Sequence, residues 1–154
     1  MRRAAPDDER FITALGAACA ASSVSQVRPI PTATAAQSFR HLRMFCRERP
    51  GTVDLIAAAD GERAGFLLLL TDVPDEVTQQ QQAFVAFMAV AEPFRRMGVG
   101  GALLAAAQTE AERFGLTHLS LMVSADNAAA RSLYAAHGFA EERLLLTKIV
   151  STGA

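Results

Sequence analysis

The fold is decided by residues 83–104, which read AFVAFMAVAEPFRRMGVGGALL. The apolar part from Ala83 to Ala91 predicts a strand, and the glycine-rich turn after it leads into a segment whose apolar residues recur at helical spacing. Gly115 is suited to the left-handed conformation that ends a helix. A strand, a glycine-rich turn and a helix N-terminus in this order direct free backbone N–H groups toward one point, and such a point favours an anion.

The turn itself has the composition of a phosphate-binding loop. The glycines within residues 98–101 let the backbone approach a pyrophosphate without interference from Cβ atoms, and Arg95 and Arg96 add positive charge nearby. A tight turn that only permits close packing would use the same glycines, so their spacing alone does not decide. No Gly-Lys-Ser/Thr follows for a nucleoside triphosphate, and Leu103 stands where a dinucleotide-binding fingerprint has its third glycine.

Helices and strands are predicted on both sides of this unit. The Asp60-Gly61 pair between two apolar runs allows the positive φ angles of a tight hairpin turn, and it is the strongest local signal. The connection Ser22–Ala36 is long enough to suggest a function, whereas Asp72–Gln82 reads as a solvated connection. The expected order is a short N-terminal strand, helices from Pro6 to about Ala21 and over Ala35–Arg49, strands over Val53–Ala59, Arg63–Leu70 and Ala83–Ala91, a helix ending at Gly115, a short buried strand over Leu119–Val123, a helix from Asn127 to Gly138, and a final strand over Leu144–Val150.

Composition limits the classes of protein to which the chain can belong. Because 51% of its 154 residues are hydrophobic, residues 1–154 are expected to form a single domain with one core. The net charge of −1, from interspersed acidic and basic residues, argues against a nucleic-acid partner. The longest apolar run, Ala64–Leu70, is far shorter than the roughly 20 residues that span a bilayer, so no membrane partner is expected.

Residues with reactive or metal-binding side chains stand apart from one another. Cys19 and Cys46 lack CxxC spacing and are interpreted as buried thiols in a reducing compartment. Acidic residues follow Met1–Arg3 where a secretory signal needs an apolar stretch, which predicts a cytoplasmic protein. His118 and His137 are expected on the solvent side without a partner at useful spacing, so no metal site is predicted.

Two motifs together resemble the signatures of the GNAT superfamily of N-acetyltransferases. Arg95-x-x-Gly98-x-Gly100 after a strand is similar to its phosphate motif, and Asn127-x-x-Ala130-x-x-Leu133-Tyr134-x-x-x-Gly138-Phe139 is similar to its second signature. The pair is specific, whereas either half alone is not. The resemblance covers Phe84–Phe139, and residues 2–8 are similar to the first strand and helix of many members. It implies an α/β (α+β) fold with a mixed, mostly antiparallel sheet flanked by helices.

The resemblance also implies acetyl-CoA as the acyl donor and assigns residues to it. The backbone of residues 88–90 would pair with the pantetheine amides, and residues 96–101 would cradle the pyrophosphate. Asn127 would hydrogen-bond the cofactor arm near its thiol end, and Tyr134, beside the sulfur, would be the catalytic proton donor to the leaving thiolate. The cofactor-binding residues implied in full are Met88, Ala89, Val90, Arg95, Arg96, Met97, Gly98, Val99, Gly100, Gly101, Asn127 and Tyr134.

Both polar side chains of the second signature also have a simpler interpretation. Tyr134 is the only tyrosine and lies on the apolar face of its helix, where a lone aromatic residue is more often part of the core. Asn127 stands where asparagine commonly caps a helix, and this role is compatible with cofactor binding.

The reaction that the resemblance implies is direct attack of a neutral amine on the acetyl thioester. A backbone N–H near the end of strand Ala83–Ala91 would stabilise the oxyanion by a hydrogen bond. The general base is unassigned, because Phe84–Val90 contains no carboxylate and Met122 stands where branches that acetylate protein N-termini often have glutamate. Glu92 is nearest in sequence but reads as a solvated loop charge. Cys46 lacks any indicated base that would make it a nucleophile.

Residues after Gly138 depart from the family pattern. No turn signal precedes Leu144, so the C-terminal strand region is expected to be shortened and the acceptor side open. Ser22–Ala36, Asp72–Gln82 or a second subunit would then cover the acceptor side. A homodimer is plausible, since exposed sheet edges often need a partner.

The leading prediction is an enzyme that acetylates a primary amine of a small molecule or a peptide. A non-catalytic acyl-CoA-binding module is the alternative, because the missing carboxylates allow it. A structural α/β domain with incidental glycines is a third hypothesis, which the joint motifs disfavour. Acetyl-CoA binding separates the third from the other two, and transfer to an amine separates the first from the second.

Overall fold

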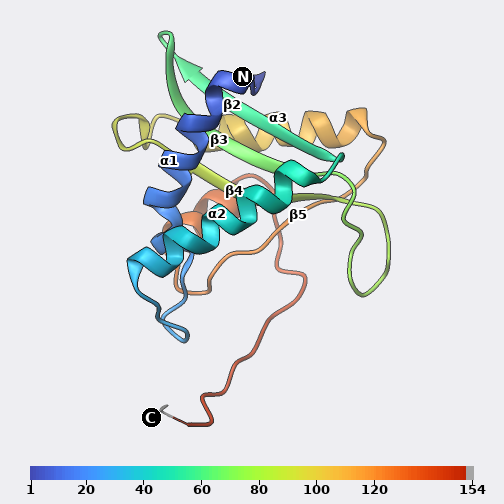
Figure 1. The fold of residues 1–154 in the computed structure, drawn as a ribbon. Helices are drawn as coiled ribbons and strands as arrows, with labels where there is room; N and C mark the ends of the chain where they lie inside the picture. The colour runs from blue at the N-terminus through green and yellow to red at the C-terminus, as the bar shows by residue number, and fades with distance from the viewer. Residues whose placement is uncertain (152–154) are drawn as a thin grey trace.

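A computed structural model describes residues 1–151, and its centre is a five-stranded sheet (Figure 1). The strands lie side by side in chain order, the first three pairs being antiparallel and the last pair parallel. This arrangement confirms the predicted mixed, mostly antiparallel sheet. The strands are β1 (Arg2–Arg3), β2 (Thr52–Ala59), β3 (Glu62–Leu70), β4 (Ala83–Val90) and β5 (Leu119–Leu121).

Helices cover both faces of the sheet (Figure 1). One face packs against α1 and α2, and the opposite face packs against α3 and α4. Short 3-10 turns precede α1, follow α1 and precede α3. The helices are α1 (Glu9–Cys19), α2 (Thr32–Glu48), α3 (Val99–Arg113) and α4 (Ala128–Ala136), and the 3-10 turns are η1 (Pro6–Asp8), η2 (Ala20–Ser23) and η3 (Glu92–Phe94).

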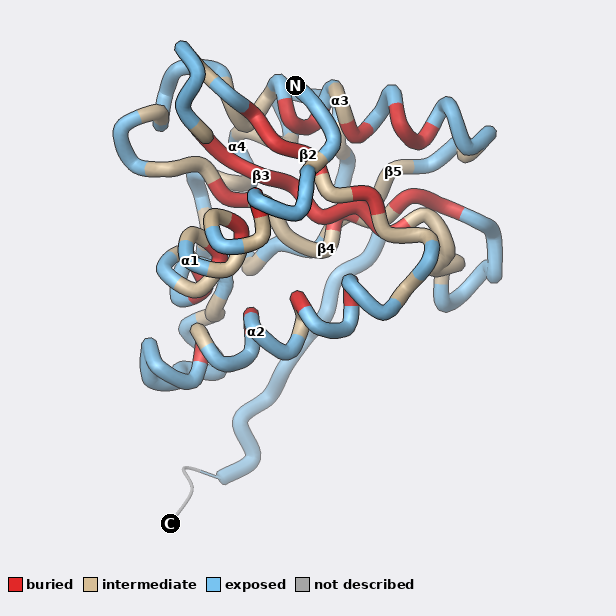
Figure 2. Tube along the Cα trace, turned by 45° about the horizontal axis from the view of Figure 1, so that its top comes forward, coloured by how far each residue is buried: buried red, intermediate tan, exposed pale blue. Residues whose placement is uncertain are grey.

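Strand β3 forms the middle of the core, which Figure 2 shows as the buried part of the sheet between the two helical layers. Its apolar run is buried on both faces, with Leu67 and Leu69 facing α3 while Phe66 and Leu68 face α1 and α2. This alternation follows from the two-residue period of a strand. The hairpin that leads into β3 turns at Asp60 and Gly61 with φ of 50° and 79°, as the sequence predicts.

Two predicted strands differ from the structure. The predicted final strand, Leu144–Val150, is not formed: the segment pairs with no strand among residues 1–151, and its side chains are exposed. The predicted buried strand Leu119–Val123 is shorter and only half-buried, because β5 is an edge strand with one neighbour. A high strand propensity means that the side chains suit the surface of a sheet, but it does not identify a neighbouring strand with which the segment can pair.

The second helix also begins earlier than predicted. It starts at Thr32 instead of Ala35, directly after Pro31, which occupies the N-cap position. A proline at this point costs nothing, since the first N–H groups of a helix have no partner within the helix. The interval between α1 and α2 is accordingly shorter than the predicted loop Ser22–Ala36.

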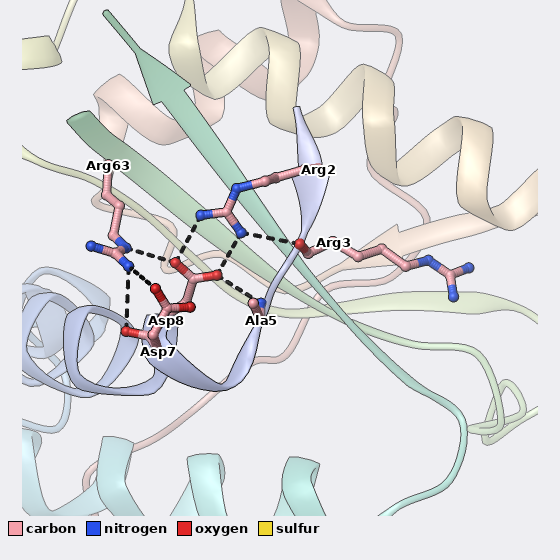
Figure 3. A network of polar contacts seen from close by, with 6 residues as sticks. All are labelled: Arg2, Arg3, Ala5, Asp7, Asp8 and Arg63. Carbon is pink, nitrogen blue, oxygen red and sulfur yellow. Dashed lines mark hydrogen bonds and ion pairs between the residues drawn. The ribbon is translucent and has the colours of Figure 1, made fainter. Parts of the chain in front are cut away.

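A buried carboxylate holds the first strand to the rest of the fold. The Asp8 side chain is fully buried, and its oxygens accept hydrogen bonds from Arg2 (2.5 and 2.9 Å), Arg63 Nε (2.6 Å) and the Ala5 N–H (2.7 Å) (Figure 3). These bonds join β1, η1 and β3. The hydrogen bond from Arg2, followed by that from Arg63, holds the pKa of Asp8 well below its usual range, although burial opposes this shift.

Replacing Asp8 by asparagine is expected to destabilise the protein by about 2–4 kcal/mol, because an amide NH₂ group would face the two guanidinium groups. Asp7→Asn is the matched control: this neighbouring carboxylate also pairs with Arg63 (3.0 Å) but is largely exposed, so its loss should cost at most about 1 kcal/mol. Urea denaturation measures both changes.

The same pair of variants tests the electrostatic origin of the effect. The folded pKa of Asp8 lies below the unfolded value of about 3.9, so its contribution is present above that pH and is lost as the pH falls through the folded pKa. The stability difference between wild type and Asp8→Asn should therefore narrow below about pH 4. A difference that stays constant into this acidic range would contradict the ion-pair explanation.

Both cysteines are free thiols. Cys46, on α2, is fully buried, and this burial raises the pKa of its thiol to about 11, whereas Cys19 at the end of α1 is half-buried. The prediction of a buried thiol is therefore correct for Cys46 and only partly so for Cys19. Among residues 1–151, no helix combines the length and the apolar composition needed to cross a bilayer.

Candidate functional site

The candidate site begins where β4 and β5 separate. The parallel register joins residues 83–85 of β4 to residues 119–121 of β5 and goes no further within the described chain. On its other side β4 stays paired with β3 as far as Val90, with a register shift at which Ala86 is the extra residue. Such a bulge bends a strand. Residues 86–90 therefore present one edge of backbone amides that no described strand covers.

The glycine-rich turn places the N-terminus of α3 beside this open edge. Gly98 is the N-cap of α3 with φ of 80° and ψ of 5°, and no described side chain caps the helix. Arg96 also has a positive φ, 62°. The first described backbone bond of this helix runs from the Ala102 N–H to the Gly98 carbonyl (3.0 Å). The N–H groups that precede it can bind an anion, which the helix dipole also favours.

Helix α4 closes the site from the opposite direction. A Cβ atom on Gly100 would lie 3.0 Å from Leu133 Cδ2 and 3.8 Å from Met88 Cε, so α3, α4 and β4 meet at this glycine. Tyr134, the next residue of α4, is half-buried and packs edge-on against Phe139 with ring centroids 5.8 Å apart. Its burial raises the pKa of Tyr134, so the phenol is a proton donor at neutral pH.

The other loop residues assigned to cofactor binding point in different directions. Arg95 folds back onto the end of β4, where Nε donates to the Val90 carbonyl (3.1 Å) and Nη2 lies 3.7 Å from Cys19 Sγ. Arg96 and Met97 are exposed. On β4, Met88 and Val90 face the α3 layer while Ala89 is buried toward α1 and α2. The site therefore brings backbone groups together more than it brings side chains together.

Asn127 performs the capping role that its position predicts. Its Oδ1 accepts from the Ala130 N–H (3.2 Å), and Asn127 is the N-cap of α4. Its Nδ2 donates to the Ser22 carbonyl (3.3 Å). Both ends of the amide are thus engaged within the chain. A hydrogen bond from Asn127 to a cofactor would have to replace or share the one to Ser22.

Two further bonds join the same two segments, and the sequence carries no signal for them. Ser124 Oγ donates to the Ser23 carbonyl (2.8 Å), and the Gln26 N–H donates to Asp126 Oδ2 (2.8 Å). Together with the Asn127 bond they hold residues 22–26 against residues 124–127. The loop after α1 is therefore fixed next to the start of α4.

Two variants of Asn127 separate capping from this contact. Asn127→Ala removes both bonds and is expected to lower the free energy of unfolding by about 1 kcal/mol. Asn127→Ser keeps a capping oxygen and should lower it by only about 0.3 kcal/mol. Thermal unfolding of the two variants measures the difference. Equal losses would show that the bond to Ser22, and not the cap, carries the stabilisation.

Within residues 1–151, neither the carboxylate nearest in sequence nor the buried carboxylate of α3 is suited to be the unassigned base. Glu92 lies in η3 and is exposed, and Met122, after β5, is exposed as well. Glu110 is buried on α3, but Arg3 Nη2 donates to it (2.5 Å) and Arg113 Nη1 lies 2.8 Å away. The hydrogen bond from Arg3 lowers the pKa of Glu110, which makes it a poor proton acceptor.

His118 and His137 lie on the solvent side, as predicted, but His137 also contacts the glycine-rich turn. Its ring rests against Gly101, where an added Cβ would come within an impossible 2.4 Å of Nε2. His137 Nδ1 is hydrogen-bonded to the Leu133 carbonyl (2.9 Å). Gly101 therefore makes room for the side chain of His137, the C-cap residue of α4, whereas the sequence motif assigned this glycine to phosphate binding alone.

Residues 24–139, more than half of the chain, match the model of the acetyltransferase (GNAT) family. The chain belongs to this family. Three curated relatives share 34–39% identity with it: the uncharacterized N-acetyltransferase YycN of Bacillus subtilis (39%, 45% of this chain), the L-2,4-diaminobutyric acid acetyltransferase of Nocardia farcinica (34%, 60%) and the aminoglycoside N(6')-acetyltransferase type 1 of Klebsiella aerogenes (35%, 60%). The matches span 44%, 46% and 62% of these three proteins, about half of their length.

Solved structures share the GNAT fold at lower identity. The aminoglycoside N-acetyltransferase AAC(6')-Iy in complex with CoA has a TM-score of 0.69 at 20% identity, over 97% of this chain and 93% of that chain. The ribosomal-protein-alanine N-acetyltransferase of Brucella melitensis has a TM-score of 0.68 at 21% identity, over 96% of both chains. At this identity the likeness concerns the fold alone.

Proposed function

We propose that the chain, as a single domain over residues 1–154, transfers the acetyl group of acetyl-CoA to a primary amine of a small molecule or peptide. The observation that carries this proposal is the uncapped N-terminus of α3, at Gly98, beside the unpaired edge of β4. Membership in the GNAT family supports the reaction class. The diaminobutyric acid and aminoglycoside acetyltransferases among the relatives favour an amine acceptor of small size.

The residues present fit the binding of acetyl-CoA. The left-handed Gly98 leaves the space above it open, since a Cβ there would meet nothing within 4 Å. A pyrophosphate would accept hydrogen bonds from the backbone N–H groups of residues 99–101. The free edge of residues 86–90 offers backbone groups to the two amides of the pantetheine arm, in the manner of an added strand. The thioester would then lie between β4 and α4.

The chain's residues would assist the transfer in three ways. A backbone N–H of β4 would stabilise the negative charge on the carbonyl oxygen as the amine nitrogen forms its new bond to carbon. Tyr134 would donate its phenolic proton to the sulfur as the carbon–sulfur bond breaks. The proton released by the amine would pass to water, since β4 carries no carboxylate and Glu110 is already paired with Arg3.

A non-catalytic acyl-CoA-binding module is the second candidate. The observation that favours it is that β4, over Ala83–Val90, carries no carboxylate and that the buried Glu110 is bound to Arg3 and Arg113. In this case the cofactor site would be retained while acceptor chemistry is lost.

Two measurements test the proposal in sequence. Calorimetric titration with acetyl-CoA should show binding in the micromolar range, and mass spectrometry should then detect acetylated product from a panel of diamines, aminoglycosides and short peptides. Binding without any product would favour the module. Absence of binding by a folded sample would contradict both candidates.

A further inference from the structure

The chain has very few amines of its own that an acetyl group could modify. Lys148 is the only lysine of the sequence, and the rest of its 15 lysine and arginine residues are all arginine. A guanidinium group cannot be deprotonated in proteins, so arginine offers no neutral amine that could attack a thioester. Apart from the N-terminal α-amino group, the side-chain amine of Lys148 is therefore the only nucleophilic primary amine of the chain.

Lys148 is accessible to another molecule. It lies in the exposed segment 144–150, which reads LLLTKIV, and the nearest apolar residues on either side of it, Leu146 and Ile149, are 87% and 64% exposed. Every ion pair among residues 1–151 uses an arginine as its cation, so none engages the lysine. Figures 1 and 2 show the segment leaving the body of the molecule toward the C-terminus.

The chain is anchored just before this segment leaves the fold. Arg143 Nη2 lies 2.7 Å from Asp75 Oδ1, in the connection between β3 and β4, and Glu142 lines a small pocket with Gln82, the residue before β4. The anchor therefore lies near the start of β4, whereas the glycine-rich turn follows the end of this strand. Residues 144–148 span about 17 Å when extended, and the eight residues of β4 span about 26 Å.

The composition of the segment favours a target outside its own chain. To enter the site of the same molecule, the segment would have to reverse its direction within a few residues, but residues 144–151 contain no Gly, Pro, Asn or Asp that would favour a tight turn. A second molecule imposes no such turn. The lysine of one copy is therefore better placed to enter the site of another copy than its own.

The border of the candidate site offers apolar contacts to the neighbours of the lysine. Val27 and Val123 adjoin residues 22–26 and 124–127, which are hydrogen-bonded to each other beside the start of α4. Their side chains are 45% and 38% exposed. Covering them with the aliphatic residues that flank Lys148 would remove apolar surface of both molecules from water, which favours the encounter.

We propose that Lys148 of one copy is an acetyl acceptor for the site of a second copy, so that the protein modifies its own C-terminal segment. The neutral amine nitrogen forms a bond to the thioester carbonyl carbon and loses one proton to water, while the carbon–sulfur bond breaks and CoA leaves as the thiol. Acetylation removes the one charge of residues 144–150. This inference rests on the proposed acetyl transfer.

Two complementary variants test the reaction between copies. Gly98→Val should lose the pyrophosphate site but keeps Lys148, and Lys148→Arg keeps the site and the positive charge but has no amine to modify. The two proteins are incubated together with acetyl-CoA, and peptide mass spectrometry follows the lysine of the first. It should be acetylated about tenfold or more faster in the mixture than in Gly98→Val alone, which measures the uncatalysed reaction.

A second measurement uses the wild type alone, and a matched control tests the choice of lysine. In the wild type, the acetylation rate per molecule at Lys148 should rise in proportion to the protein concentration, as a reaction between copies requires. Arg47→Lys combined with Lys148→Arg places an exposed lysine on α2 instead, because the Arg47 side chain is 62% exposed. This lysine should stay unmodified over the same time.

The outcomes separate this inference from the proposed function. A mixture that reacts no faster than Gly98→Val alone, a wild-type rate per molecule that is independent of concentration, or equal modification of the lysine on α2 each overturns the inference. Lys148→Arg is also assayed with the amine panel. Acetylated product from that panel without acetylation of Lys148 in the mixture overturns this inference alone, whereas the absence of both contradicts the proposed acetyl transfer as well.

Discussion

Gly98→Val is expected to weaken acetyl-CoA binding by about 100-fold or more, which corresponds to about 2.7 kcal/mol. Gly98 holds φ of 80° at the N-cap of α3, and a β-branched residue resists this conformation. The valine would rotate the N–H groups of residues 99–101 away from a common point and would fill the space that the pyrophosphate requires. Isothermal titration of the folded variant measures the loss.

Gly61→Val is a closely matched control for this experiment. Gly61 has φ of 79°, and an added Cβ would also meet nothing within 4 Å, so both substitutions impose the same backbone strain in open surroundings. Each should cost about 1–3 kcal/mol of stability. Only Gly98→Val should lose binding, because Gly61 lies in the hairpin turn between β2 and β3. Equal affinity of both variants for acetyl-CoA would contradict a pyrophosphate site at the glycine-rich turn.

Tyr134→Phe is expected to lower kcat by about 100-fold while KM for acetyl-CoA changes little. The ring is retained, so its packing against Phe139 persists, and only the proton donor to the departing thiolate is lost. Steady-state kinetics on the acceptor found in the amine panel provides the measurement. Calorimetry on the same variant should return the wild-type affinity.

The pH dependence of the reaction rate also tests the role of Tyr134. Burial raises the pKa of Tyr134 above the ordinary value, so the phenol should stay protonated over the whole range in which an amine acceptor becomes neutral. The rate of the wild type should therefore rise with pH without an early decline attributable to Tyr134. An unchanged kcat in Tyr134→Phe would leave this tyrosine as a residue of the core.

Elements with a local signal could be predicted from the sequence. The hairpin at Gly61 and the ends of α3 at Gly115 and α4 at Gly138 all depend on a positive φ, which glycine adopts without strain. The N-cap role of Asn127 belongs to the same class, because its partner is the N–H three residues further on. The family motifs located the region where α3, α4 and β4 meet.

Features that depend on distant residues could not be predicted. The segment Leu144–Val150 has strand propensity, but the propensity contains no information about a partner, and no described strand pairs with it. The bond between Gln26 and Asp126 joins residues one hundred positions apart. The direction of Arg95 likewise depends on the Val90 carbonyl and Cys19, whereas its charge alone suggested phosphate binding.

Because Cys46 is buried, the rate at which its thiol is alkylated can report local opening of the fold. A thiol-alkylating reagent reacts with the thiolate, which a pKa of about 11 makes rare at neutral pH, and the side chain is fully covered by the sheet. Cys19 is half-buried and should be modified first. Alkylation of Cys46 then proceeds only when α2 detaches from the sheet, and its rate measures how often this detachment occurs without any introduced label.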